Sequence, residues 1–162
     1  MNKFLLRVIS NTRHLVLGLV DGGVSGLSVL TTSFFIGNFN GVEVFKLCLS
    51  VSIANLASNF GGGYLAEEAE SGKHQRFIEK SMGVKQGYLN KTAFTERLEQ
   101  KTFVRALVYG FASVAGILLG AFPMLFLPMP YAFYASFAIS LVLFLLVGFL
   151  IGKLTRQSEL FT

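Results

Sequence analysis

The sequence contains no tryptophan, one cysteine, three prolines and two histidines among its 162 residues. A single cysteine, Cys48, excludes an internal disulfide, and without further cysteines a structural zinc site has no basis. The chain lacks a Walker A loop, a dinucleotide-binding glycine fingerprint and an HExxH motif. Its serines have no suitable histidine and aspartate partners. We therefore expect no enzyme active site and no covalently bound cofactor.

Charge is also scarce, because charged residues make up 14% of the chain against about 25% in typical soluble domains. Hydrophobic residues reach 52%, and they are concentrated in four blocks. Blocks of about 20 apolar residues are long enough to cross a bilayer as helices. The sequence predicts an all-α, polytopic transmembrane helix bundle that forms a single membrane domain over residues 1–162. The four expected spans are 15–36, 47–66, 106–127 and 131–152.

Residues 67–105 form the one long polar segment, between the second and third spans. Its first part continues the second span as a helix, and Gly83 is the expected stop. Asn90 or Thr92 is expected to cap a helix that runs into the third span. Pro123 is expected to kink the third span near its far end. A short amphipathic surface helix is expected before the first span.

The basic residues predict the orientation. They flank the first and fourth spans and occupy the polar segment, whereas the other two connections hold only Lys46. The positive-inside rule then places both termini and residues 67–105 in the cytoplasm. We expect an integral, multi-pass protein of the plasma membrane. The net charge of +5 is thus a topology signal for the lipid bilayer and does not indicate nucleic acid.

Asp21 is the only charged residue in the first span. A carboxylate within the hydrocarbon core costs about 2.5–3.5 kcal/mol on insertion scales, and such residues commonly serve function. The simpler alternative is a buried aspartate that only bonds a neighbouring helix. Around Asp21, glycines spaced four apart create a face for close helix packing. The expected packing glycines are Gly18, Gly22 and Gly26, with Gly116 and Gly120 in the third span.

Asn59 is expected at a depth similar to that of Asp21, in the second span. Together with Ser25 and Ser58, these two residues would form one oxygen-rich layer that lines a transport pathway. Such a layer suits a hard or borderline divalent cation. The alternative is ordinary hydrogen bonding between helices, which is worth less than about 2 kcal/mol per contact.

A second candidate cation site lies in the polar segment. Glu67, Glu70 and His74 are spaced to share one helix face, and Glu96 and Glu99 form a further carboxylate pair. Carboxylate and imidazole groups in this arrangement can ligate a divalent metal. The competing interpretation is a solvated helix face with ion pairs between neighbouring turns.

Two motifs resemble one known family. Residues 18–25, GLVDGGVS, resemble the G-x-x-D-G-x-x-S signature that opens the first span of the vacuolar iron transporter family. Residues 57–64, ASNFGGGY, are similar to that family's S-M-x-x-G-E-Y stretch, with Asn59 and Gly63 in place of its methionine and glutamate. A glutamate-rich segment and a proline near the end of the third span follow the same plan. The chain resembles a short, divergent, prokaryotic member with four spans.

The resemblance implies a homodimeric transporter that moves Fe²⁺, and often Mn²⁺, out of the cytoplasm in exchange for protons. Asp21 would then line the pathway, and the cytoplasmic glutamates would collect the ion. The alternative is a non-transporting membrane interaction or scaffold protein that keeps the fold but has lost the metal pathway. The replacements at Asn59 and Gly63 favour this alternative, whereas Asp21 and the acidic helix favour transport.

Overall fold

The computed structural model describes residues 3–37, 40–85, 87–89 and 93–159, and this part of the chain is almost entirely helical. It contains four long α-helices, one short 3₁₀-helix and no strand. The elements are α1 (Lys3–Ile36), α2 (Gly41–Ser81), α3 (Ala93–Ala121), η1 (Phe122–Leu125) and α4 (Tyr131–Glu159). The prediction of an all-α fold with four long apolar helices is confirmed for these residues.

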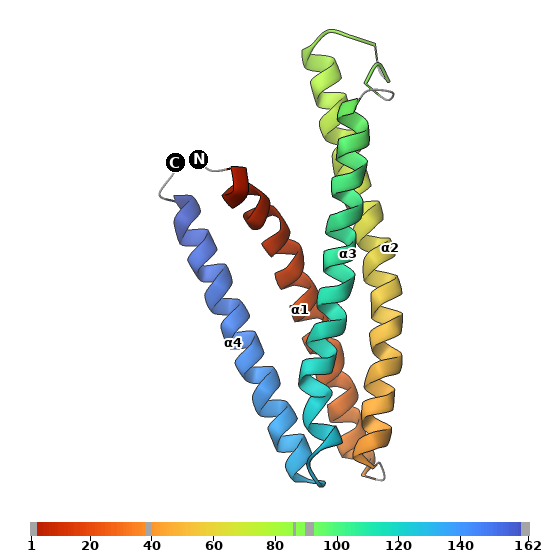
Figure 1. Cartoon of the computed structure of the whole chain (residues 1–162), viewed down its shortest axis with the longest axis vertical. Helices are drawn as coiled ribbons and strands as arrows, with labels where there is room; N and C mark the ends of the chain where they lie inside the picture. The colour runs from red at the N-terminus through yellow and green to blue at the C-terminus, as the bar shows by residue number, and fades with distance from the viewer. Residues whose placement is uncertain (1–2, 38–39, 86, 90–92, 160–162) are drawn as a thin grey trace.

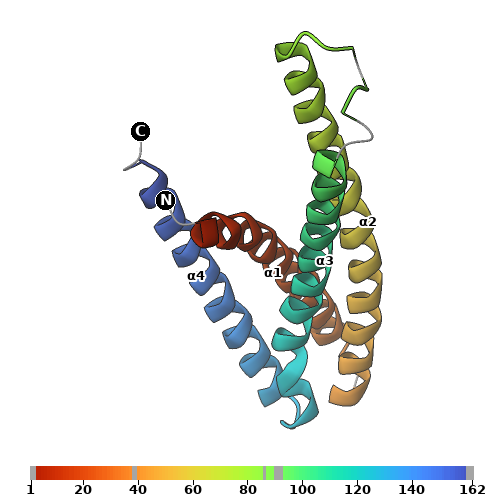
Figure 2. The same ribbon diagram turned by 45° about the horizontal axis from the view of Figure 1, so that its top comes forward.

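The helices run alternately up and down, and α3 lies at the centre of the bundle (Figure 1). Its most extensive contacts are with α1 and α2, and α4 packs more lightly against α1 and α3. Both chain ends lie at the same end of the bundle as the α2–α3 connection. There, α2 and α3 reach well beyond the other two helices, as both ribbon views show (Figure 2).

Glycines allow α1 and α3 to approach at backbone distance. A Cβ atom at Gly22 would overlap the Ser113 backbone, and one at Gly18 would overlap the carbonyl oxygen of Tyr109. In return, a Cβ at Gly116 would come within 2.6 Å of the Leu19 carbonyl oxygen. Small residues with this spacing permit such contacts because no side chain separates the backbones. The predicted packing face therefore joins two helices of one chain.

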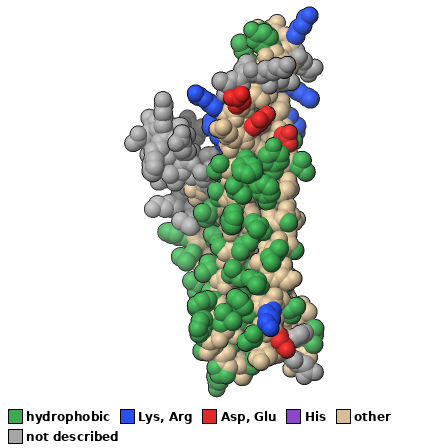
Figure 3. All heavy atoms as spheres, turned by 45° about the vertical axis from the view of Figure 1, so that its right-hand side comes forward, with side chains coloured by type: hydrophobic (Ala, Val, Ile, Leu, Met, Phe, Trp, Pro, Cys, Tyr) green, Lys and Arg blue, Asp and Glu red, His purple; other side chains and the backbone are tan. Residues whose placement is uncertain are grey.

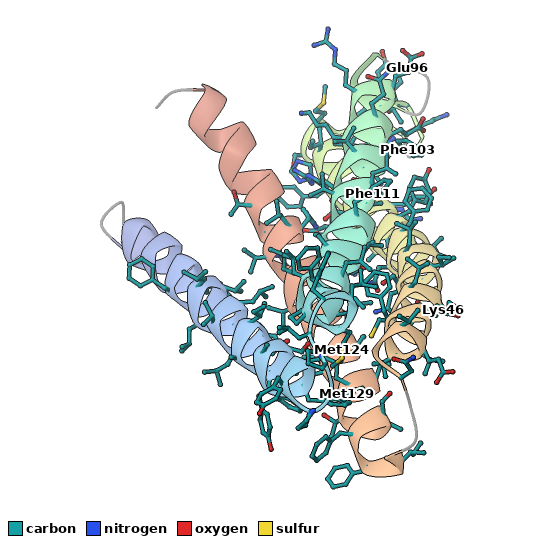
Figure 4. All side chains as sticks on the ribbon, turned by 60° about the horizontal axis from the view of Figure 1, so that its bottom comes forward. Lys46, Glu96, Phe103, Phe111, Met124 and Met129 are labelled. Atoms are coloured by element: carbon teal, nitrogen blue, oxygen red, sulfur yellow. The ribbon has the colours of Figure 1, made fainter. Side chains whose placement is uncertain are left out.

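The remaining packing glycines follow the same interface toward α4. A Cβ at Gly26 would lie 3.3 Å from the Cα of Ile117, and one at Gly120 would lie 2.9 Å from the hydroxyl of Ser140 on α4. Beyond them, Leu30, Ile117 and several neighbours form a tightly buried apolar cluster. Its members are Leu30, Val44, Cys48, Ile117, Ala121, Met124, Ala132 and Phe133. Figure 4 shows the labelled Met124 and Met129 close to one another, where η1 and the α3–α4 connection meet the bundle.

Many large apolar side chains lie on the outside of this bundle, in addition to those in the buried cluster. Several small polar residues are buried, among them Ser52, Ser113 and Ser136, whereas Phe35 and Phe149 are 80% and 71% exposed. A band of hydrophobic side chains covers the middle of the face in Figure 3, and charged side chains gather toward its two ends. Large apolar side chains on the outside need a non-aqueous neighbour, since soluble monomers rarely expose patches of this extent.

The helices begin or end away from the limits of the expected membrane spans and elements in four places, and the spans themselves stay a prediction. α1 runs without a break from Lys3, so no separate surface helix precedes it, and α2 begins at Gly41 rather than at residue 47. α3 ends at Ala121, where a 3₁₀ turn that begins at Phe122 and contains Pro123 follows, so the expected kink is instead a helix end. α4 continues past residue 152 to Glu159.

The end of α2 agrees with the prediction. The helix continues through the first part of the polar segment to Ser81, and Gly83 follows with φ +66°. Glycine suits that left-handed conformation because it carries no Cβ. The predicted cap at Asn90 or Thr92 lies outside the described residues.

Candidate functional site

The centre of the candidate site is a hydrogen bond between α1 and α2. The side-chain amide of Asn59 donates to the Asp21 carboxylate, with a distance of 2.6 Å between nitrogen and oxygen. Both side chains are partly buried between the helices. A hydrogen bond to a charged group contributes about 1.5–3 kcal/mol, which offsets part of the cost of a carboxylate in an apolar layer. The structure thus brings together Asp21 and Asn59, two residues of the predicted layer.

One helical turn further from the chain ends, a second polar pair repeats this arrangement. The Asn55 amide donates to the hydroxyl of Ser25 at 2.9 Å. Asn55 and Asn59 are four residues apart on α2, as are Asp21 and Ser25 on α1, so the two pairs stack along one seam. Ser58, predicted as part of this layer, is exposed instead. It directly precedes Asn59, and adjacent helix residues point about 100° apart.

Tyr109 of α3 lies beside this seam, on the side of the chain ends. The edge of its ring would lie 3.0 Å from a Cβ atom at Gly63, so the ring occupies the space that a side chain at position 63 would need. Gly63 is one turn from Asn59 on α2. An aromatic residue from a third helix therefore joins the polar pairs.

A further turn toward the chain ends, three helices meet at Glu67. Arg105 of α3 donates from Nη1 to Glu67 Oε2 at 2.8 Å, and His14 Nε2 of α1 lies 3.2 Å from Glu67 Oε1. The Glu67 side chain is only 12% exposed. Each carboxylate oxygen thus already has a nitrogen partner from another helix, which links α1, α2 and α3 at this level.

The predicted cytoplasmic metal ligands do not gather at Glu67. Glu70, His74 and Glu96 are exposed, and Figure 4 shows the labelled Glu96 near the outer end of α3, beyond Phe103. Within the described part of the chain, no three histidine, cysteine, aspartate or glutamate side chains form a group that could hold a metal ion. Glu67 is directed at α1 and α3, so it does not act together with Glu70 and His74 in this conformation.

Glu99 lies in a different place, a cleft of about 340 Å³ between the extended parts of α2 and α3. Glu68, which is not among the predicted metal ligands, lines this cleft together with Glu99. The other polar residues of the lining are Ser71, Gln75, Thr95 and Thr102. The hydroxyls of Ser71 and Thr102 lie 3.4 Å apart and join the two helices beneath the cleft.

Glu79 is a carboxylate with a structural role, because it organises the α2–α3 connection. It is 2% exposed and accepts hydrogen bonds from the backbone N–H groups of Gly87 and Leu89, at 3.0–3.1 Å. These two backbone donors hold the pKa of Glu79 below its ordinary value of 4.5, since they favour the ionised form. The sequence offers no distinct signal for this role, because Glu79 is one of several glutamates on the same helix.

Comparison with known proteins gives a relative whose function is not described. The chain is 29% identical over 149 residues to the uncharacterized protein MJ0645 of Methanocaldococcus jannaschii, and the match covers 92% of this chain and 77% of that protein. No family model and no solved structure matches the chain.

Proposed function

We propose that this chain is an integral, multi-pass membrane protein that transports divalent metal cations. Four helices are long and apolar enough to cross a bilayer, and the outward-facing side chains are large and apolar. A helix of 41 residues, such as α2, is about 60 Å long, roughly twice the hydrocarbon core. The bilayer then surrounds the part of α2 near Asn55 and Asn59, and the remainder projects with α3 into the cytoplasm.

The orientation of this proposal combines geometry with charge. Both chain ends and the α2–α3 connection lie at one end of the bundle (Figure 1), and the basic residues are concentrated in these three regions. By the positive-inside rule that end faces the cytoplasm of a plasma membrane. The homodimer implied by the vacuolar iron transporter resemblance stays a prediction.

The pairing of Asp21 with Asn59 is the observation that carries the transport proposal. Asp21 is the only aspartate of the chain, and it lies within an apolar helix against a polar face of α2. Carboxylates at this depth commonly mark ion pathways or proton relays. Two polar pairs one turn apart give the ion or proton more than one position along the same seam.

The chemistry of the seam favours particular cations. Its donor groups are a carboxylate, two side-chain amides and a hydroxyl, from Asp21, Asn55, Asn59 and Ser25, and all of them offer oxygen. Oxygen donors suit hard or borderline divalent ions such as Mn²⁺ and Fe²⁺ better than soft ions, which prefer sulfur. Among the ions that oxygen donors suit, the family resemblance favours export of Mn²⁺ or Fe²⁺.

Proton coupling follows from the single carboxylate. Asp21 can hold a metal ion or a proton but not both, because protonation removes the charge and the lone pair that ligate the metal. Metal moving outward and protons moving inward would use Asp21 in alternation. This step agrees with the exchange that the resemblance implies.

A scaffold protein without transport is the second candidate, and one observation favours it. The amides of Asn55 and Asn59 are bonded within the seam, and Glu67 is already paired with Arg105 and His14. These contacts are sufficient for a protein whose polar residues serve only to hold its helices together. Such a protein would tolerate replacement of Asp21 by asparagine, which keeps the shape and a hydrogen bond.

Flux measurement distinguishes the two functions. The purified chain is reconstituted into liposomes that contain a Mn²⁺-sensitive dye, and Mn²⁺ entry is followed with and without a proton gradient. Transport predicts saturable Mn²⁺ entry that depends on the gradient and exceeds entry into empty liposomes. Flux equal to that of empty liposomes, from correctly folded protein, would support the scaffold.

A further inference from the structure

Three helices present an ordered set of side chains along the seam. On α2, residues 55, 59, 63 and 67 are each four apart and therefore share one face. Asn55 and Asn59 bond to α1, Gly63 is covered by the Tyr109 ring, and Glu67 is paired with Arg105 and His14. From the cytoplasmic end inward, the seam therefore contains Glu67 first, then the Tyr109 ring over Gly63, and then Asn59 and Asn55.

Glu67 is the last carboxylate on this face of α2 before the level of Asp21, and its partners are already basic. Arg105 lies 2.8 Å from one carboxylate oxygen and His14 lies 3.2 Å from the other. The guanidinium is always charged. Arg105 therefore occupies the carboxylate that would otherwise attract an entering cation. A charge-assisted hydrogen bond of this length is one of the stronger side-chain contacts.

Arg105 and Tyr109 act from the same face of α3, because they are four residues apart. The Tyr109 ring packs against Gly63, one turn from Glu67 and one turn from Asn59. The contact is tight because position 63 carries no side chain. Any shift of α3 that withdraws Arg105 from Glu67 also moves Tyr109 relative to Gly63.

We propose that Arg105 and Tyr109 form the cytoplasmic gate of the Asp21 pathway, and that a divalent cation opens it by displacing Arg105 from Glu67. This inference rests on the proposed transport function and adds its regulation. One carboxylate cannot bind a guanidinium and a divalent ion at full strength together, so the two compete. The gate stays closed when cytoplasmic metal is scarce, and it opens when metal occupies Glu67.

Accessibility of the seam to a water-soluble reagent tests the gate without reference to transport. Ser25→Cys is introduced into a Cys48→Ala chain and exposed to a charged, membrane-impermeant methanethiosulfonate from the cytoplasmic side of proteoliposomes. The thiol of this near-isosteric substitution reports whether the reagent passes Tyr109. Arg105→Gln and Tyr109→Ala should each speed labelling about tenfold or more, because the rate follows the population of the open state. Lys101→Gln, an exposed position on α3, is the matched control and should have no effect.

Two further variants separate the charge from the packing of Arg105. Arg105→Lys should keep most of the protection, and the exchange Glu67→Arg with Arg105→Glu should restore it by forming the pair in reverse. Mn²⁺ should speed labelling when Arg105 is present and should add nothing in Arg105→Gln. If Arg105→Gln does not elute as folded protein, Arg105→Lys and the Mn²⁺ effect still decide the question.

The outcomes separate the gate from the transport function. Labelling that is unaffected by Arg105→Gln, Tyr109→Ala and Mn²⁺ overturns the gate, even if Mn²⁺ flux is observed. Labelling that rises with Arg105→Gln but not with Mn²⁺ overturns opening by the cation. Labelling that responds to both supports the gate, and Mn²⁺ flux measured on the same preparations then decides the transport proposal separately.

Discussion

The Asn59 side chain on α2 donates a hydrogen bond of 2.6 Å to Asp21, the only aspartate of the chain, on α1. This bond joins the two helices at a polar point between apolar surfaces. Asn59→Ala should leave Asp21 without this donor and should lower the free energy of unfolding by about 1–3 kcal/mol. Denaturant titration in mild detergent measures the change.

Ser58→Ala is the matched control for this prediction. Ser58 precedes Asn59 and is exposed, so its substitution should leave stability nearly unchanged. Equal losses from both variants would mean that the Asp21–Asn59 bond contributes nothing specific to the fold.

Gly22 and Gly62 should respond in opposite directions to substitution by alanine. A Cβ at Gly22 would overlap the Ser113 backbone, so Gly22→Ala must push α1 away from α3 and should destabilise the bundle strongly. Gly62 has nothing within 4 Å of an added Cβ, so Gly62→Ala should be neutral or stabilise by about 1 kcal/mol through helix propensity. Thermal unfolding of both variants in detergent checks the pair. A mild effect at Gly22 would contradict the close approach of the two backbones.

Glu79 should make the α2–α3 connection sensitive to acid. Its pKa is below 4.5 in the folded chain because the Gly87 and Leu89 amides bond the carboxylate. The ionised Glu79 carboxylate stabilises the connection fully at pH values above its ordinary pKa. This stabilisation is lost as the pH falls through the lowered pKa of the folded chain. A spin label at Lys85→Cys, in a Cys48→Ala chain, should become more mobile over that range.

Two variants complete the Glu79 experiment. Glu79→Gln should make the label mobile at neutral pH and should remove the acid transition. Glu70→Gln, at an exposed position of the same helix, should change neither. An acid transition that persists in Glu79→Gln would assign it to another group.

The proposed topology is tested by labelling single cysteines, again in a Cys48→Ala chain. Because both chain ends and the α2–α3 connection lie at one end of the bundle, a thiol at Gly83 should react from the cytoplasm. A thiol at Asn40, in the α1–α2 connection, should react only from outside. Reaction of both positions from one side would refute the membrane arrangement.

The helices could be predicted from the sequence because apolar blocks of membrane-spanning length are a strong signal. The common depth of Asp21 and Asn59 followed from counting residues along two antiparallel spans. The role of Asn55 could also be predicted, because Asn55 is four residues from Asn59, just as Ser25 is four residues from Asp21. Ser58 was predicted in the layer because it is next to Asn59 in the sequence. Helical spacing, however, decides which residues share a face, and it places Ser58 on another face.

The partners of Glu67 could not be predicted in this way. His14 and Arg105 reach it from α1 and α3, and their meeting depends on how three helices pack. The position of Tyr109 against Gly63 depends on the same packing. Spacing on α2 alone grouped Glu67 with Glu70 and His74, because it contains no information on which face α3 covers.

Transport that depends on Asp21 is the central claim, and Asp21→Asn tests it most directly. The variant keeps the size of the side chain and removes only the charge and the site for a proton. Mn²⁺ flux into proteoliposomes is compared for the unaltered chain, Asp21→Asn and Glu43→Gln, an exposed carboxylate at the start of α2. The account predicts that Asp21→Asn abolishes gradient-dependent Mn²⁺ flux while Glu43→Gln retains it. Equal flux from Asp21→Asn and the unaltered chain would contradict the account.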